Sequence, residues 1–195
     1  MTPITLVVEG PTDTALVNKL FQHVGLLLGT IYAVGGKSKL DLKLPGYNNA
    51  AQSAPWFVLR DLDQDEPCAP ALSRRLLKKP ARYMRLRIAV HQSESWLLSD
   101  PERIARFLGI QAVLVPPSPD ELVNSKQALV NLARASRSRE IREALVPREG
   151  STAAVGRLYT SLISEFALHH WRPGIAAKRS DSLSRCIRAL RDFSP

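Results

Sequence analysis

The sequence predicts an α/β fold, in which a mostly parallel sheet of about four strands with flanking helices is followed by a helical C-terminal part. In the first half, short apolar runs rich in β-branched and aromatic residues alternate with segments whose apolar residues recur at helical spacing. In the second half, helix starts and amphipathic stretches follow one another. Alternating strands and helices favour a parallel sheet, because each crossover helix returns the chain to the same edge.

The elements of the first half follow from its apolar pattern. Residues 4–8 (ITLVV) form a strand, and the apolar residues of 16–24 recur as in a helix, which Gly25 ends. The Gly-, Asn- and Pro-containing segment 35–55 is expected to be a loop with at most a short helical turn. The remaining expected elements are strands at 30–34, 56–59 and 84–90 and a helix at 69–79.

The second half is expected to be helical throughout. Asp100 and Asp120 are typical helix starts, because an Asp followed by Pro or Glu suits the first turn. Two further amphipathic stretches cover residues 153–170 and 182–193. The expected organisation is an α/β core at 1–100 with a helical extension at 101–195 packed on it.

The composition predicts a basic protein with nucleic acid as its partner. The chain has 195 residues, and its 27 Lys and Arg against 18 Asp and Glu give a formal charge of +9. Such a balance favours a polyanionic partner, although a merely solvated basic face would give the same count. Cys68 and Cys186 form no CxxC or Cys/His cluster, which argues against zinc. The chain shows no signal peptide or membrane span, which predicts a soluble cytoplasmic protein with no membrane partner.

Carboxylates follow two of the predicted strands at the point where each strand ends. Glu9 follows the first strand, and Asp61 and Asp63 end the third strand two residues apart. Since ligands of open parallel sheets bind beyond the carboxyl ends of the strands, these side chains are expected to converge and to bind Mg²⁺ or Mn²⁺. The alternative is structural: a capped strand-to-helix turn at Glu9 and a solvated acidic loop at Asp61 and Asp63.

This pattern resembles the TOPRIM domain, which topoisomerases, bacterial-type primases and overcoming-lysogenization-defect nucleases share. The resemblance covers roughly residues 1–100 and rests on Glu9-Gly10, on Asp61-Leu62-Asp63 and on their order along the chain. With "GGKSKL" and "HQSESWLLSD", the chain looks most like small standalone TOPRIM-like proteins, some of them in phage defence. The resemblance implies a TOPRIM/Rossmann-like sheet. It also implies that Glu9 acts as general acid/base or metal ligand, that Asp61 and Asp63 hold Mg²⁺, and that a separate ATPase chain is a partner.

Three further residues are candidates for the same site. Asp13 could bind a second metal ion, but capping of the following helix explains it equally well. Lys37 in "GGKS" could neutralise a phosphate, although the Walker pattern fails because Ile31 stands where a glycine is needed. Glu94 follows the fourth strand, where a further acid or proton shuttle is expected, and the alternative is that it only opens a helix.

The segment 74–87 (RRLLKKPARYMRLR) is a candidate nucleic-acid surface. It carries seven basic residues and no acid, and Arg85 and Arg87 lie on one face of a predicted strand. The alternative is an edge strand protected by charge. The candidate phosphate contacts are Arg74, Arg75, Lys78, Lys79, Arg85 and Arg87.

Together these features predict a metal-dependent nuclease that hydrolyses phosphodiester bonds in DNA or RNA, with Glu9, Lys37 and Glu94 as catalytic residues and Glu9, Asp13, Asp61 and Asp63 as metal ligands. One alternative is a TOPRIM-like module that binds nucleic acid or regulates a partner without turnover. Another is a nucleotide-binding α/β domain, against which the failed Walker pattern and the lack of GxGxxG argue.

Overall fold

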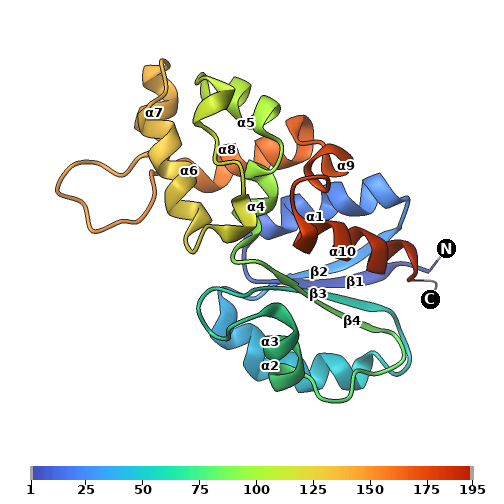
Figure 1. Cartoon of the computed structure of the whole chain (residues 1–195). Coiled ribbons are helices and arrows are strands. Elements are labelled where there is room, and N and C mark those ends of the chain that lie inside the picture. Colours follow the sequence, from blue (N-terminus) through green and yellow to red (C-terminus); the bar gives the residue numbers. More distant parts are fainter. Residues whose placement is uncertain (1, 194–195) are drawn as a thin grey trace.

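The computed structural model describes residues 2–193 and confirms the predicted α/β fold. The sheet contains β1 (Ile4–Val8), β2 (Leu28–Ala33), β3 (Trp56–Asp61) and β4 (Met84–Ala89), in the order β2-β1-β3-β4. All of the paired strands are parallel, so their carboxyl ends meet at one edge (Figure 1). In the central pair of strands Leu6 of β1 lies opposite Phe57 of β3, and at the carboxyl end of β3 Asp61 lies opposite Ala89 of the edge strand β4.

Helices cover both faces of the sheet. On one face, α1 (Pro11–Val24) packs on Leu6, Val8 and Phe57 through its own Leu16 and Leu20. On the other face lie α2 (Lys37–Ala50) and α3 (Ala69–Leu76), as Figure 1 shows. This arrangement gives the three-layer order expected of a parallel sheet that is buried on both sides.

The prediction of a loop at residues 35–55 was wrong, because most of this segment forms α2. Pro45 lies inside this helix, where it removes a backbone donor, and the Gly and Asn residues have weak helix propensity. Burial of Leu40 and Leu44 against Val7, Val58 and Met84 overrides those preferences. The two leucines are four residues apart, and this i, i+4 spacing was the helical signal available in the sequence.

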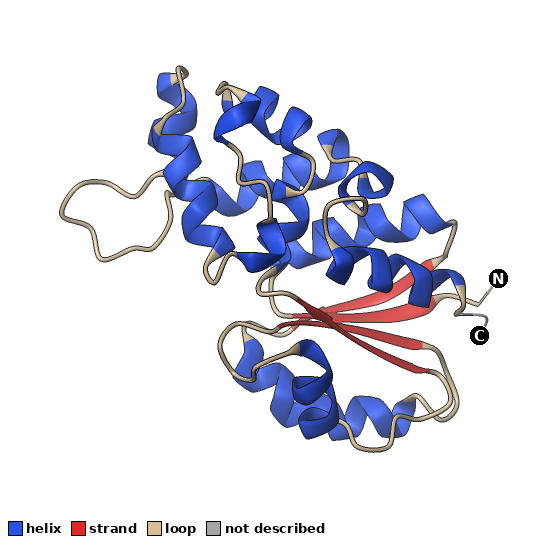
Figure 2. Ribbon diagram, in the orientation of Figure 1, coloured by secondary structure: helices blue, strands red, loops and turns tan. Residues whose placement is uncertain are grey.

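The second half is helical and lies on the α1 side of the sheet (Figure 2). The helix predicted at Asp120 begins later, at Ser125, and residues 153–158 form a loop instead of the start of a helix. The helices are α4 (Ser93–Leu98), α5 (Pro101–Leu108), α6 (Ser125–Arg134), α7 (Arg139–Leu145), α8 (Tyr159–Glu165), α9 (Pro173–Ala176) and α10 (Asp181–Arg191), with 3₁₀ turns at Ala112–Leu114 and Pro119–Glu121 and a π-helical turn at Phe166–His170.

One hydrophobic core joins the sheet to the helical part. It contains Leu6 and Phe57 of the strands together with Leu129 of α6 and Ile163 of α8. Buried Trp96 of α4 donates its indole hydrogen bond to Ser182 Oγ of α10 at 2.7 Å. The helical part is therefore packed on the α1-covered face of the sheet through shared apolar contacts. Within residues 2–193, no helix has the length and apolar character of a membrane span.

Candidate functional site

A cavity of about 290 Å³ lies at the carboxyl edge of the sheet, where α/β proteins place their ligands. It brings together four of the predicted residues, Glu9, Asp13, Asp61 and Glu94. Glu9 follows β1, Asp13 lies in the first turn of α1, Asp61 ends β3, and Glu94 lies in the first turn of α4. The helical part completes the wall with Lys126 of α6 and Tyr159 of α8, among others.

Glu9 is held between a backbone donor and a buried arginine. Its Oε1 accepts a hydrogen bond from the backbone N–H of Asp61 at 3.1 Å and lies 3.8 Å from Arg60 Nε. Burial raises the pKa of Glu9, while the Asp61 N–H and the Arg60 charge lower it, and the net shift is upward. Arg60 itself is 1% exposed and pairs with Asp41 and Asp65 as well, so it neutralises Glu9 only in part.

Ser93 joins two of the carboxylates. Its backbone N–H donates to Asp61 Oδ1 at 2.9 Å, and its hydroxyl donates to Asp13 Oδ1 at 2.7 Å. Asp13 also accepts the Gly10 N–H at 3.0 Å, so the capping role considered from the sequence is present in the structure. Asp13 therefore caps α1 and faces the cavity at the same time.

Glu94 is the most deeply buried acid of the cavity, with 2% of its surface exposed. Its Oε1 accepts a hydrogen bond from the Tyr159 hydroxyl at 3.1 Å and lies 3.4 Å from Lys126 Nζ. Its Oε2 is buried and has no hydrogen-bond partner among the described residues. Burial raises the pKa of Glu94 despite the nearby Lys126 charge. A buried carboxylate oxygen without a partner is costly, so this oxygen is available to a ligand.

The cavity carries more negative charge than its neighbours neutralise. Burial raises the pKa of Asp61 well above its usual value, and the charges of Asp13, Glu94 and Glu9 raise it further. Carboxylate oxygens are the ligands that Mg²⁺ and Mn²⁺ prefer, and a bound cation would relieve this repulsion. Across residues 2–193, however, no three Asp, Glu, His or Cys side chains are grouped closely enough to hold a metal ion as they stand.

Asp63 and Lys37 lie beside the cavity and do not line it. The sequence argument placed Asp61 and Asp63 on one side of an extended strand, but β3 ends at Asp61. Asp63 has a φ of 49°, in the left-handed region, so the strand alternation no longer applies to it. Lys37 Nζ lies 2.9 Å from Asp63 Oδ2 and 2.9 Å from Asp65 Oδ1. The pairing of Lys37 with Asp63 therefore fixes the loop after β3.

The sheet divides the predicted basic surface into two parts. Arg74, Arg75, Lys78 and Lys79 are exposed on and just after α3, where Arg75 pairs with Glu66 at 2.7 Å. Arg85 and Arg87 lie on the opposite face, partly covered by α10 and the residues after it. The guanidinium of Arg85 lies 4.3 Å from the centre of the Phe193 ring. Burial raises the pKa of the Cys186 thiol to about 12, even though the charge of the neighbouring Arg87 acts to lower it.

Sequence reasoning did not identify Ser93, Lys126 or Tyr159. Ser93 stands directly before Glu94 at a helix start, so its position in "HQSESW" was an available signal. Lys126 and Tyr159 come from later helices, and Tyr159 lies 65 residues beyond Glu94 in the sequence. Only tertiary packing brings the two residues to the carboxyl edge. No protein-family model matches the chain, and no curated protein or solved structure is detectably similar to it. The function is therefore inferred from the geometry of the site.

Proposed function

We propose that this protein is a metal-dependent nuclease that hydrolyses phosphodiester bonds in DNA or RNA with Mg²⁺ or Mn²⁺. The observation that carries the proposal is the cavity in which Glu9, Asp13, Asp61 and Glu94 face one another beside Lys126. The formal charge of +9 supports a polyanionic substrate. The order of the Glu9-Gly10 and Asp61-Leu62-Asp63 motifs, which resembles the TOPRIM pattern, supports the same class of reaction.

The four cavity carboxylates are the residues that would hold the metal, because they supply only hard oxygen donors and Glu94 Oε2 has no other partner among the described residues. A bound divalent ion lowers the pKa of water and stabilises negative charge on the phosphate. Asp63, which pairs with Lys37, is assigned a supporting role in the loop after β3.

The chain's own groups position the reactants and move the proton. Ser93 holds Asp13 and Asp61 in place through its hydroxyl and its N–H. Glu9, whose pKa is raised by burial, would accept a proton from the attacking water as the water oxygen bonds to phosphorus. The P–O bond to the leaving sugar oxygen breaks in the same displacement, and that oxygen takes up a proton from solvent. The Lys126 ammonium would stabilise the negative charge on a non-bridging phosphate oxygen. The sequence argument gave this role to Lys37.

The cellular setting is proposed from the resemblance alone. Small TOPRIM-like proteins of this kind suggest a cytoplasmic nuclease that acts in phage defence together with a separate ATPase chain.

A second candidate is a module that binds nucleic acid without cleaving it. The observation in its favour is that, within the described chain, no three acids are grouped closely enough to hold a metal ion as they stand. In this case the Lys126–Glu94 pair, at 3.4 Å, is a structural ion pair and not part of a catalytic site.

Cleavage assays with the Glu9→Gln variant test the proposal. Labelled DNA and RNA would be incubated with Mg²⁺, Mn²⁺ or EDTA, and the wild type is expected to cleave one of them only with metal present. Glu9→Gln keeps the size of the side chain and removes its charge and basicity, so it should lose at least about 100-fold in rate with an unchanged fold. Glu165→Gln, the same change at an exposed position of α8, is the matched control and should cleave normally. Full turnover by Glu9→Gln would remove this residue from the mechanism.

A further inference from the structure

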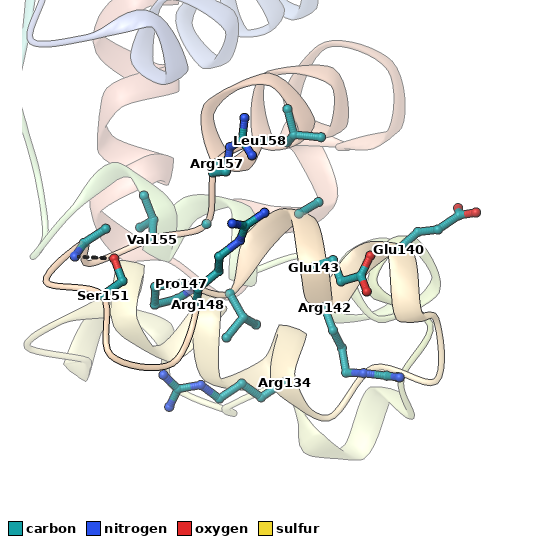
Figure 3. Close-up of a pocket in the computed structure, with 14 residues that line it drawn as sticks. Arg134, Glu140, Arg142, Glu143, Pro147, Arg148, Ser151, Val155, Arg157 and Leu158 are labelled. Carbon is teal, nitrogen blue, oxygen red and sulfur yellow. Dashed lines mark hydrogen bonds between the residues drawn. The ribbon is translucent and has the colours of Figure 1, made fainter.

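A second, larger cavity of about 1070 Å³ lies between α6, α7 and the segment 146–158, and arginines dominate its polar lining (Figure 3). Arg134 comes from α6, Arg142 from α7, and Arg148 and Arg157 from the connecting segment. None of these arginines belongs to the basic run at residues 74–87.

Two of these arginines, Arg148 and Arg157, have guanidinium groups that could bind an anion. Arg148 and Arg157 are exposed, and neither guanidinium has a hydrogen-bond or ion-pair partner among residues 2–193. The acids that line the cavity are Glu140 and Glu143, and Glu143 already pairs with Arg139 at 2.6 Å. In Figure 3, Arg148 and Arg157 extend from the connecting segment, while Glu140 and Glu143 lie on α7.

The arginine cavity adjoins the carboxylate cavity. Val155 lines both, and the same segment continues into Tyr159 and Thr160, which line the carboxylate cavity. A nucleic-acid backbone with one phosphate bound in the carboxylate cavity would therefore run past Val155. Its next phosphates would reach Arg148 and Arg157.

The base of the segment is fixed against α7. The backbone N–H of Gly156 donates to Leu145 O at 2.9 Å, and that of Leu158 donates to Ala144 O at 3.0 Å. A Cβ at position 156 would lie 2.3 Å from Ala144 O, so only glycine permits this contact. Val155 and Arg157 are thus held in a defined position beside the carboxylate cavity.

We infer that the arginine cavity binds the phosphodiester backbone of single-stranded nucleic acid that extends from the carboxylate cavity. This inference rests on the proposed function. A single strand is the substrate that fits, because Glu94 is 2% exposed inside a cavity of about 290 Å³, where a duplex cannot follow. The arginines would contact phosphates and read no sequence.

The test is binding of a labelled single-stranded oligonucleotide in EDTA, which separates binding from cleavage. Arg148→Ala/Arg157→Ala is expected to bind roughly tenfold more weakly at low salt, and to flatten the slope of log K against log salt by up to about 1.4, because each phosphate contributes about −0.7. Arg148→Lys/Arg157→Lys keeps both charges and should restore most of the slope. Arg188→Ala/Arg191→Ala, which removes two exposed charges from α10 at the other end of the molecule, should bind like the wild type (Figure 1).

The outcomes separate the two proposals. An alanine double variant that is folded and binds with wild-type affinity and slope would overturn the arginine site, even if the wild type cleaves with Mn²⁺. Lack of oligonucleotide binding by the wild type would overturn it as well. Loss of binding in the double variant together with no cleavage by the wild type would support the arginine site and overturn the nuclease.

Discussion

At the residue scale, Ser93 explains how mutually repelling acids are kept at the carboxyl edge. Its two hydrogen bonds, at 2.9 Å to Asp61 and 2.7 Å to Asp13, fix the orientation of both carboxylates but leave their charge in place. The charge costs stability, since burial raises the pKa of both groups. Buried charge that is oriented but not neutralised is typical of functional sites.

Asp61→Asn is therefore expected to stabilise the metal-free fold at pH 7. The pKa of Asp61 is raised in the folded protein, so the folded state favours the neutral, protonated side chain. The free energy of unfolding is therefore highest below the unfolded pKa of about 3.9, where Asp61 is neutral in both states, and this contribution is lost as the pH rises through the folded pKa. Asn keeps the acceptor for Ser93 N–H and removes the charge. The melting temperature in EDTA should rise, by about 2–4 °C for each kcal/mol gained, and the gain should vanish at low pH. A lower melting temperature than wild type at pH 7 would contradict this assignment.

At the scale of elements, the segment 146–158 depends on the close approach of Gly156 to α7. Gly156→Ala places a Cβ 2.3 Å from Ala144 O and 2.5 Å from Leu145 C, which are backbone atoms that cannot turn away. We expect a loss of about 1–3 kcal/mol in the free energy of unfolding, measured by urea titration. Gly46→Ala in α2 meets nothing within 4 Å and is the matched control, with an expected gain of about 0.5–1 kcal/mol. Equal stability of the two variants would show that the segment is not fixed at Gly156.

The same scale shows what the sequence could predict. The strands and α1 were predictable because their apolar runs have the period of their secondary structure, and the positions of Glu9 and Asp61 followed from the strand ends. α2 was missed because burial of Leu40 and Leu44 outweighs the local preference of Pro45. Asp63 was misplaced because its left-handed φ is a property of the turn and not of the strand. Lys126 and Tyr159 were not predicted because tertiary packing brings them to the site, and such packing gives no periodic pattern in the sequence.

At the scale of the whole molecule, the helical part does more than cover the sheet. Its α6 and α8 close the carboxylate cavity, and the segment before α8 joins that cavity to the arginine cavity. The strands and α1 thus supply Glu9, Asp13 and Asp61, while the helical part supplies Glu94, Lys126 and the two exposed arginines Arg148 and Arg157. The chain carries a net charge of +9 although its candidate site is acidic. We interpret this excess of positive charge as a means of attracting a polyanion to that site.

Calorimetric titration with Mn²⁺ tests the central claim, that the carboxylates of this cavity bind a divalent cation, most directly. We expect the wild type to bind Mn²⁺ and Asp61→Ala to lose that binding, because Asp61 lies among Glu9, Asp13 and Glu94. Glu165→Gln, which removes one exposed carboxylate of α8, should bind like the wild type. Equal Mn²⁺ binding by the wild type and Asp61→Ala, or no binding by the wild type, would contradict the claim.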